Sequence, residues 1–184
     1  MFPRCSLNMR GFLAGAAVCI CTLLAACGSP EDPKDRSVKE IDGKHYDAEG
    51  NPTFKIDGGK VDWYTFSGYV HFTATCLVCH GPDGTGSTFA PTLAISLNRL
   101  SYQEFVAAVT EGRRTAANAM PPFRQNKMVM CYLDDLYVYL RARARRAVPH
   151  GMPEKHEPKP AAAVKAEDEC LGQFRSHTHR SAED

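Results

Sequence analysis

The segment Cys76-Leu77-Val78-Cys79-His80 constrains this chain more than any other part of its sequence. Two thiols at this spacing can add across the two vinyl groups of one haem, and the adjacent histidine then lies beneath the iron as its proximal ligand. A redox dithiol would require a β-α-β setting, which the flanking sequence lacks. A zinc site would require a second pair of ligands at short spacing, whereas Cys131 is alone in its region. We therefore predict covalent haem at Cys76 and Cys79, with His80 on the iron.

The N-terminal segment has the three-part composition of an export signal. Residues 1–10 carry two arginines and no acid, residues 11–26 form an uncharged apolar run, and a polar segment with prolines follows. The apolar run is shorter than a typical membrane span. We expect residues 1–26 to be cleaved. The ending Leu24-Ala25-Ala26-Cys27 also resembles a bacterial lipobox, in which Cys27 would carry a lipid anchor; ordinary cleavage nearby is the alternative.

The export signal and the net charge limit where this chain can be located and what it can bind. The expected location is the periplasm of a Gram-negative bacterium, with the chain either soluble or lipid-anchored, so any membrane contact would be through the anchor. The 22 Lys and Arg against 21 Asp and Glu give a net charge of +1, which argues against a nucleic-acid binder. A hydrophobic content of 43% in 184 residues allows one packed domain with extensions.

Helical signals dominate the central part of the chain. An aromatic-rich helix is expected over residues 61–75, directly before the two cysteines, with a strand as the alternative because of the β-branched residues. Ser101 and Glu104 have the spacing of a capping box and predict a helix over 102–111. Apolar residues at i, i+3, i+4 and i+7 predict a last helix from about Met128 to Arg146.

The flanking segments are predicted to be less regular. A flexible leader is expected over 27–41, and β-compatible runs on either side of the turn at 47–52 favour a small hairpin. The haem domain with this hairpin is placed at 42–147, and a C-terminal extension at 148–184. Within the extension, residues 152–169 resemble a linker or loose wrap, followed by a disordered polar tail.

A haem iron held by one histidine needs a sixth ligand for electron transfer, or an open site for gas or peroxide chemistry. Met120 lies in Ala119-Met120-Pro121-Pro122-Phe123, where two prolines can hold a thioether in a rigid loop with little entropy cost. We predict Met120 as this ligand, with Met128 as the second candidate. Ligation by His and Met raises the reduction potential relative to two histidines, which suits an electron carrier.

The surroundings of the haem can be predicted by role. The backbone carbonyl of Pro91 could accept the ring N–H of His80 and so fix the orientation of the ring. Three glycines would let the chain fold closely over the haem: Gly81, Gly84 and Gly86. Six aromatic residues are interpreted as core packing: Trp63, Tyr69, Tyr102, Phe105, Phe123 and Tyr137.

The order of these motifs resembles that of the class I c-type cytochromes. An aromatic helix precedes CLVCH, and HGPDGTG, APTL, MPPF and a terminal helix follow, over residues 61–147. The chain is more similar to one subgroup, the methanol-metabolism-related four-cysteine c-type cytochromes. That resemblance spans 42–172 and includes the hairpin, the block MPPFRQNKMVMCYLDDLYVYLRARA and a late single cysteine, Cys170. It implies an all-α class I cytochrome c fold around one covalent haem, with a small N-terminal β-hairpin and an extended C-terminal tail.

The resemblance also implies the function. Such proteins accept electrons from PQQ-dependent alcohol or methanol dehydrogenases and pass them towards a terminal cytochrome oxidase or another cytochrome c. By the same resemblance Cys76 and Cys79 attach haem, while His80 and Met120 ligate iron. The expected mechanism is outer-sphere electron transfer, so the chain is not expected to be an enzyme. The alternatives are a haem peroxidase or gas-binding protein with a labile sixth ligand, and a haem module that acts only within a dehydrogenase complex.

Cys131 and Cys170 would both be unpaired thiols in an oxidising compartment, and one disulfide between them uses both. An intermolecular bridge is the alternative.

Two groups of basic residues remain. A positive rim near the sixth ligand is expected from Arg113, Arg114, Arg124 and Lys127, and a solvated helix end from Arg141, Arg143, Arg145 and Arg146.

Overall fold

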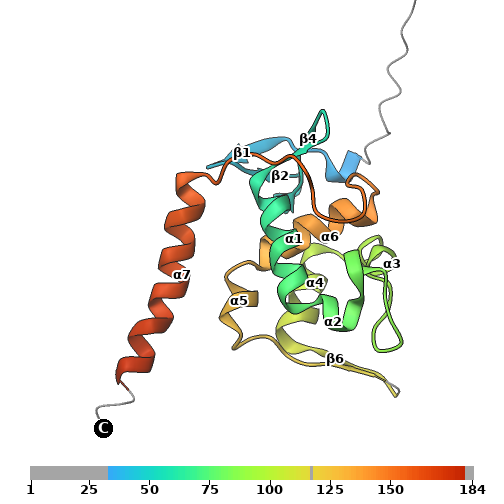
Figure 1. Cartoon of the computed structure of the whole chain (residues 1–184), viewed down its shortest axis with the longest axis vertical. Coiled ribbons are helices and arrows are strands. Elements are labelled where there is room, and N and C mark those ends of the chain that lie inside the picture. Colours follow the sequence, from blue (N-terminus) through green and yellow to red (C-terminus); the bar gives the residue numbers. More distant parts are fainter. Residues whose placement is uncertain (1–32, 117, 181–184) are drawn as a thin grey trace, which may run out of the picture.

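The computed structural model describes residues 33–116 and 118–180 (Figure 1). The predicted signal peptide and Cys27 lie outside these residues. The helices are α1 Trp63–Thr75, α2 Leu77–His80, α3 Leu93–Leu97, α4 Tyr102–Glu111, α5 Lys127–Met130, α6 Leu133–Ala144 and α7 Ala161–Arg180, with 3-10 turns η1 Pro33–Asp35 and η2 Pro82–Gly84. The strands are β1 Lys39–Ile41, β2 Lys44–Tyr46, β3 Pro52–Thr53, β4 Ile56–Asp57, β5 Lys60–Val61, β6 Arg113–Arg114 and β7 Ala119–Met120. Within this part of the chain, no helix is both long and apolar enough to cross a membrane.

Helices α1 and α6 cross at the centre of the fold (Figure 1). Asp62 caps α1, because its carboxylate accepts hydrogen bonds from the backbone N–H of Thr65 at 2.9 Å and its hydroxyl at 2.6 Å. Gly68 lies at the crossing, where an added Cβ would be 1.9 Å from the backbone oxygen of Asp135. Only glycine permits this approach, which brings the buried Phe72 and Tyr139 into one core.

Helix α4 has the predicted bounds and the predicted capping box. The Ser101 side chain accepts the N–H of Glu104, and the Glu104 carboxylate accepts the N–H of Ser101 at 2.8 Å. Phe105, Ala108 and Val109 form its buried face, as their spacing indicated. The helix ends before Gly112, which has a positive φ of 75°.

The segment before α1 is more ordered than a flexible leader. Strand β2 pairs antiparallel with β3 across the turn at 47–51, and β1 adds to the other edge of β2. The prediction of a flexible leader is therefore wrong from Pro33 onward, because η1 and β1 occupy that stretch and Asp35 is buried.

The predicted last helix over 128–146 is two helices. The break at Cys131 and Tyr132 separates α5 from α6. Both residues contact other elements: Cys131 forms a disulfide, and the Tyr132 ring stacks on His71 with centroids 3.4 Å apart. The Tyr132 hydroxyl also donates to Glu167 of α7 at 2.5 Å. These contacts favour a backbone turn that an uninterrupted helix would not allow.

The prediction of a solvated arginine end is correct for Arg146, which is exposed, but wrong for Arg141 and Arg143. Arg141 and Arg143 are buried. The Nε of Arg141 donates to Asp35 at 2.5 Å, and Arg145 pairs with the other oxygen of the same carboxylate. Arg143 donates to the backbone oxygen of Val148 at 2.7 Å. A buried arginine requires a partner for its charge. The partners of Arg141 and Arg143, the Asp35 carboxylate and the Val148 oxygen, both lie outside α6.

The C-terminal extension first wraps the domain and then forms a helix. His156 makes a parallel bridge with Val61, and its ring stacks on Phe66 with centroids 3.8 Å apart. The predicted linker and disordered tail are wrong from Ala161, because α7 runs from there to Arg180. In Figure 1 this helix lies beside α5, along one side of the molecule.

The disulfide Cys131–Cys170 confirms the predicted pairing and joins α7 to the end of α5. Its two cysteines are 39 residues apart. We expect the double change Cys131→Ala, Cys170→Ala to lower the free energy of unfolding by about 4 kcal/mol through loop entropy. Chemical denaturation of the holoprotein measures this. Denaturation curves that coincide for the oxidised wild type and the double variant would contradict it; reducing agent should destabilise only the wild type.

Candidate haem-binding site

The end of α1 delivers the two cysteines and the histidine on one side of a helical turn. The N–H of Cys76 still bonds to Phe72 of α1 at 2.8 Å, and the N–H of His80 bonds to the Cys76 oxygen at 3.0 Å. Cys79 and His80 therefore follow Cys76 at i+3 and i+4 in continuous helical backbone. Residues at this spacing share a face of the helix. One planar ligand can thus meet all three side chains.

The Cys76 thiol does not have the character of a redox-active cysteine. Neither Cys76 nor Cys79 is in a disulfide; Cys76 is half-buried and Cys79 is exposed. Burial raises the pKa of the Cys76 thiol to about 11, with a smaller contribution from Cys79. Redox-active cysteines instead have lowered pKa values in electropositive surroundings. The Cys76 thiol therefore lacks the activation of a redox-active cysteine.

His80 is buried, and its orientation is restricted by the loop that follows. Its Nδ1 lies 3.4 Å from the backbone oxygen of Pro91, the contact that the sequence suggested. Burial lowers the pKa of the imidazole, and the Pro91 carbonyl offsets this only in part. A neutral ring that donates from Nδ1 presents Nε2 as a metal ligand.

The segment after His80 turns back onto the motif. Gly81, Gly84 and Gly86 all have positive φ, at 70°, 70° and 91°. The N–H of Gly86 bonds to the His80 oxygen at 2.7 Å, and a Cβ on Gly81 would lie 2.5 Å from the Gly86 oxygen. The Ser87 hydroxyl donates to the Cys79 oxygen. This loop fixes the backbone on which the thiols and the imidazole stand.

Met120 is in β7, at the start of the proline loop. It pairs with Arg113 of β6 and is half-buried against the main core. The loop is attached to the end of α4, since the N–H of Phe123 bonds to the Val109 oxygen at 2.9 Å. Met128, the second candidate, is on α5 and 49% exposed. The thioether of Met120 is therefore held more firmly by its surroundings than that of Met128.

The residues around these groups fit a haem. Side chains from the motif, α3 and the proline loop are half-buried against the same core: Cys76, Leu77, Leu93, Met120 and Phe123. An apolar surface with two thiols, a neutral imidazole and a thioether matches the macrocycle, its vinyl groups and its iron. Within residues 33–116 and 118–180, no three His, Cys, Asp or Glu side chains gather as they would for another metal.

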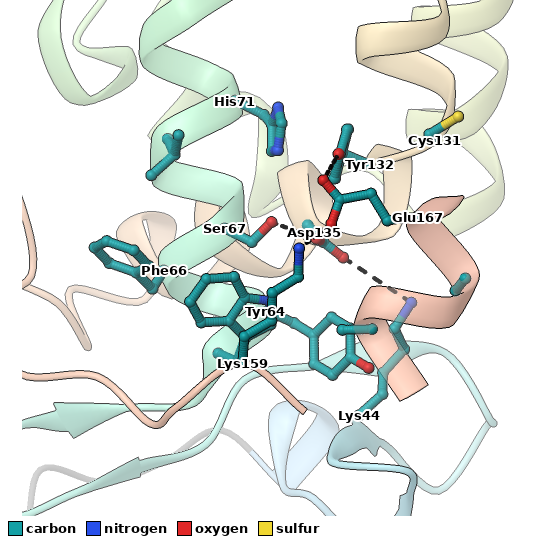
Figure 2. Close-up of a pocket in the computed structure, with 14 residues that line it drawn as sticks. Lys44, Tyr64, Phe66, Ser67, His71, Cys131, Tyr132, Asp135, Lys159 and Glu167 are labelled. Carbon is teal, nitrogen blue, oxygen red and sulfur yellow. Dashed lines mark hydrogen bonds and ion pairs between the residues drawn. The ribbon is translucent and has the colours of Figure 1, made fainter. Parts of the chain in front are cut away.

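A cavity of about 130 Å³ lies between α1, α6 and α7 (Figure 2). Asp135 is buried in its wall, accepts the Ser67 hydroxyl at 2.6 Å and lies 4.0 Å from the Lys44 nitrogen. Burial raises the pKa of Asp135 to about 7, although Lys44 and Ser67 oppose the shift. None of the residues predicted to attach haem or to ligate its iron lines this cavity. Sequence reasoning missed these polar groups because their partners are far apart along the chain.

Comparison with known proteins gives a consistent result. The family model described as cytochrome c oxidase, cbb3-type, subunit III, matches residues 66–140. Cytochrome c-553I of Paracoccus denitrificans is 48% identical over 134 residues, 70% of this chain. The aligned part is 59% of that relative's length. Cytochrome c-555 of Methylococcus capsulatus is 43% identical over 96 residues, which are 52% of this chain and 75% of the relative.

A solved structure is similar as well. The crystal structure of the c-type cytochrome XoxG from Methylobacterium extorquens AM1 superposes with a TM-score of 0.72 at 52% sequence identity. The match covers 74% of this chain and 87% of the other. This likeness extends the agreement from sequence to the arrangement of the helices.

Proposed function

This chain belongs to the class I c-type cytochromes, electron carriers with covalently bound haem c, and from that premise we propose a specific role for it. It carries single electrons in the periplasm from a PQQ-dependent methanol or alcohol dehydrogenase towards a terminal oxidase. The sequence holds a single C-x-x-C-H segment, which supports one haem per chain.

We assign the site residues as follows. Cys76 and Cys79 form the thioether bonds, and His80 and Met120 are the axial ligands. The observation that carries this assignment is the continuous helical turn from Cys76 to His80, with the His80 ring directed by Pro91. Met120 completes the set because its loop is bonded to α4 and its side chain packs on the same core as Cys76.

The chain's own contribution to electron transfer is to hold this site rigid and partly exposed. When bound, haem c supplies a one-electron couple between ferric and ferrous iron. The hydrogen bonds of the 81–91 loop and the proline loop keep the ligand-bearing backbone in place. Apolar side chains stay exposed on the attachment side, Val78 at 78% and Phe89 at 69%, where a partner can approach without displacing the core.

The donor assignment is supported by the resemblance to the methanol-metabolism-related cytochromes over residues 42–172. Its test is reduction of the oxidised holoprotein by a PQQ-dependent methanol dehydrogenase that is turning over methanol. We expect rapid appearance of the reduced spectrum, which depends on both enzyme and methanol. Failure, together with normal reduction by another periplasmic donor such as a thiosulfate-oxidising system, would reject the donor and leave the haem assignment intact.

The predicted basic rim is exposed where it can meet such a donor. Arg113, Arg114 and Arg124 are exposed, whereas Lys127 is half-buried. Strand β6 lies at the same end of the molecule as α2 (Figure 1). A positive rim favours an acidic partner and a rate of association that falls with salt. We expect Arg113→Glu with Arg114→Glu to slow reduction at low salt on the order of tenfold and to flatten the salt dependence.

The matched control makes the same change in charge elsewhere. Lys39 and Lys60 are exposed in β1 and β5, in the strand region at the opposite end of Figure 1 from β6. Lys39→Glu with Lys60→Glu should leave the rate close to that of the wild type. Equal slowing by both double variants would show an effect of net charge and contradict a localised rim. Stopped-flow reduction at several salt concentrations measures both.

A further inference from the structure

Asp83 follows His80 by three positions and has an unusual backbone conformation. Its φ of 54° and ψ of 20° place it in the left-handed region, which residues other than glycine seldom adopt. Such a conformation costs free energy and persists where the surrounding structure fixes it. The contacts of the Asp83 side chain show what fixes it here.

The Asp83 carboxylate receives hydrogen bonds from two distant parts of the chain. The hydroxyl of Tyr139, in α6, donates to it at 3.1 Å. The N–H of Gly151 lies 3.1 Å from both carboxylate oxygens, and Nδ1 of His150 is 3.1 Å from one of them. Only 9% of the Asp83 side chain is exposed. The carboxylate thus ties the loop after His80 to the central helix and to the C-terminal extension.

This loop is continuous with the axial histidine. The N–H of Gly84 bonds to the Gly81 oxygen at 3.2 Å, and the N–H of Gly86 returns to the His80 oxygen at 2.7 Å. Asp83 therefore lies within a closed turn whose two ends meet at His80. A displacement of Asp83 would be transmitted to the His80 backbone.

The Asp83 carboxylate also remains charged. Burial opposes its ionisation, but the hydrogen bonds from Gly151, His150 and Tyr139 outweigh burial and lower its pKa. Arg143, which contacts His150 at 2.9 Å, adds a favourable charge. A fixed negative charge near an iron centre stabilises the ferric over the ferrous state, because the ferric ion carries one more positive charge.

We propose that Asp83 is a positioning residue for the axial histidine, through which α6 and the C-terminal extension hold the proximal side of the haem and lower its reduction potential. This inference rests on the proposed ligation by His80. It gives the segment around residues 148–151 a role in electron transfer.

The decisive variant is Asp83→Asn, since the amide keeps the shape and can still accept from Tyr139 and Gly151 while losing the charge. We expect its midpoint potential to rise, with a melting temperature close to that of the wild type. The matched control is Asp57→Asn, an exposed residue of β4 at the far end of Figure 1 from α2. Its potential should not change. Equal potentials for Asp83→Asn and the wild type would overturn the proposal.

A second variant tests positioning separately from charge. Asp83→Ala also loses the contacts with Tyr139 and Gly151, so the His80 ring should no longer be held in one orientation. We expect the electron paramagnetic resonance signal of its ferric haem to broaden, whereas that of Asp83→Asn stays sharp. A sharp, unshifted signal for Asp83→Ala would reject the positioning role.

A third variant separates failure of this inference from failure of the ligand assignment. His80→Ala should lose the low-spin spectrum of the haem. If it keeps that spectrum, the ligand assignment fails and the inference falls with it. If it loses the spectrum while Asp83→Asn leaves the potential unchanged, only the role of Asp83 is rejected.

Discussion

Replacing both Cys76 and Cys79 with alanine is expected to give a chain with no covalently attached haem. The two thiols are the proposed points of attachment, and they share a face of one helical turn with His80. Without them, haem can be held only by its axial ligands and apolar contacts. Acid extraction followed by mass measurement of the intact chain reports the bond directly, even for a variant that folds poorly. The wild type should retain the mass of haem, and the double variant should not.

The control is the second pair of cysteines. Cys131 and Cys170 are joined to each other in the structure, so their removal should leave the haem in place. Attachment that survives in the Cys76 and Cys79 variant would contradict the assigned site. Loss of haem from the Cys131 and Cys170 variant, in a chain that still folds, would contradict the disulfide as their role.

Replacing Met120 is expected to produce the second large effect, on the iron itself. In Met120→Ala the sixth position opens, so the oxidised protein should lose its thioether-to-iron absorption band and the reduced protein should bind CO. In Met120→His, a second imidazole should lower the midpoint potential on the order of 0.1 V, within the span of about 0.8 V that axial ligands cover. Absorption spectra and a potentiometric titration measure both changes.

Met128→Ala is the matched control, because Met128 is the second candidate ligand from the sequence and is 49% exposed. It should keep the band, the potential and the resistance to CO. A reversed result, in which Met128→Ala loses the band and Met120→Ala keeps it, would move the sixth ligand to α5.

Local sequence signals predicted the parts of the fold that depend on neighbouring residues. The bounds of α4 followed from its capping box, because Ser101 and Glu104 satisfy each other's backbone within one turn. The arrangement of Cys76, Cys79 and His80 followed from their spacing, since they lie on a single helical turn.

The wrong predictions involve contacts between residues far apart in the sequence. Periodicity cannot show that Arg141 and Arg145 share Asp35, because that carboxylate comes from a segment before the first strand. The break between α5 and α6 likewise depends on α7, whose Glu167 accepts the Tyr132 hydroxyl. Helix α7 itself has good helix formers after Pro160, but the prolines before it made the whole stretch resemble a linker.

The same difference between local signals and distant contacts applies to the candidate haem site. The proposed ligands are local features that sequence reasoning could name, and the structure contains the predicted contact from His80 to Pro91. Asp83 was absent from that set, because nothing near it in the sequence shows that Tyr139 and Gly151 converge on its carboxylate. Residues that tune a site through distant contacts therefore become visible only in the folded chain.

The most direct test of the proposed one-electron carrier is an optical redox titration of the wild-type holoprotein. Ligation by His80 and Met120 predicts a low-spin spectrum throughout, a thioether-to-iron band in the oxidised form and a single transition with a one-electron slope. A high-spin ferric spectrum without that band would contradict this, because it would show an open sixth position suited to peroxide or gas chemistry.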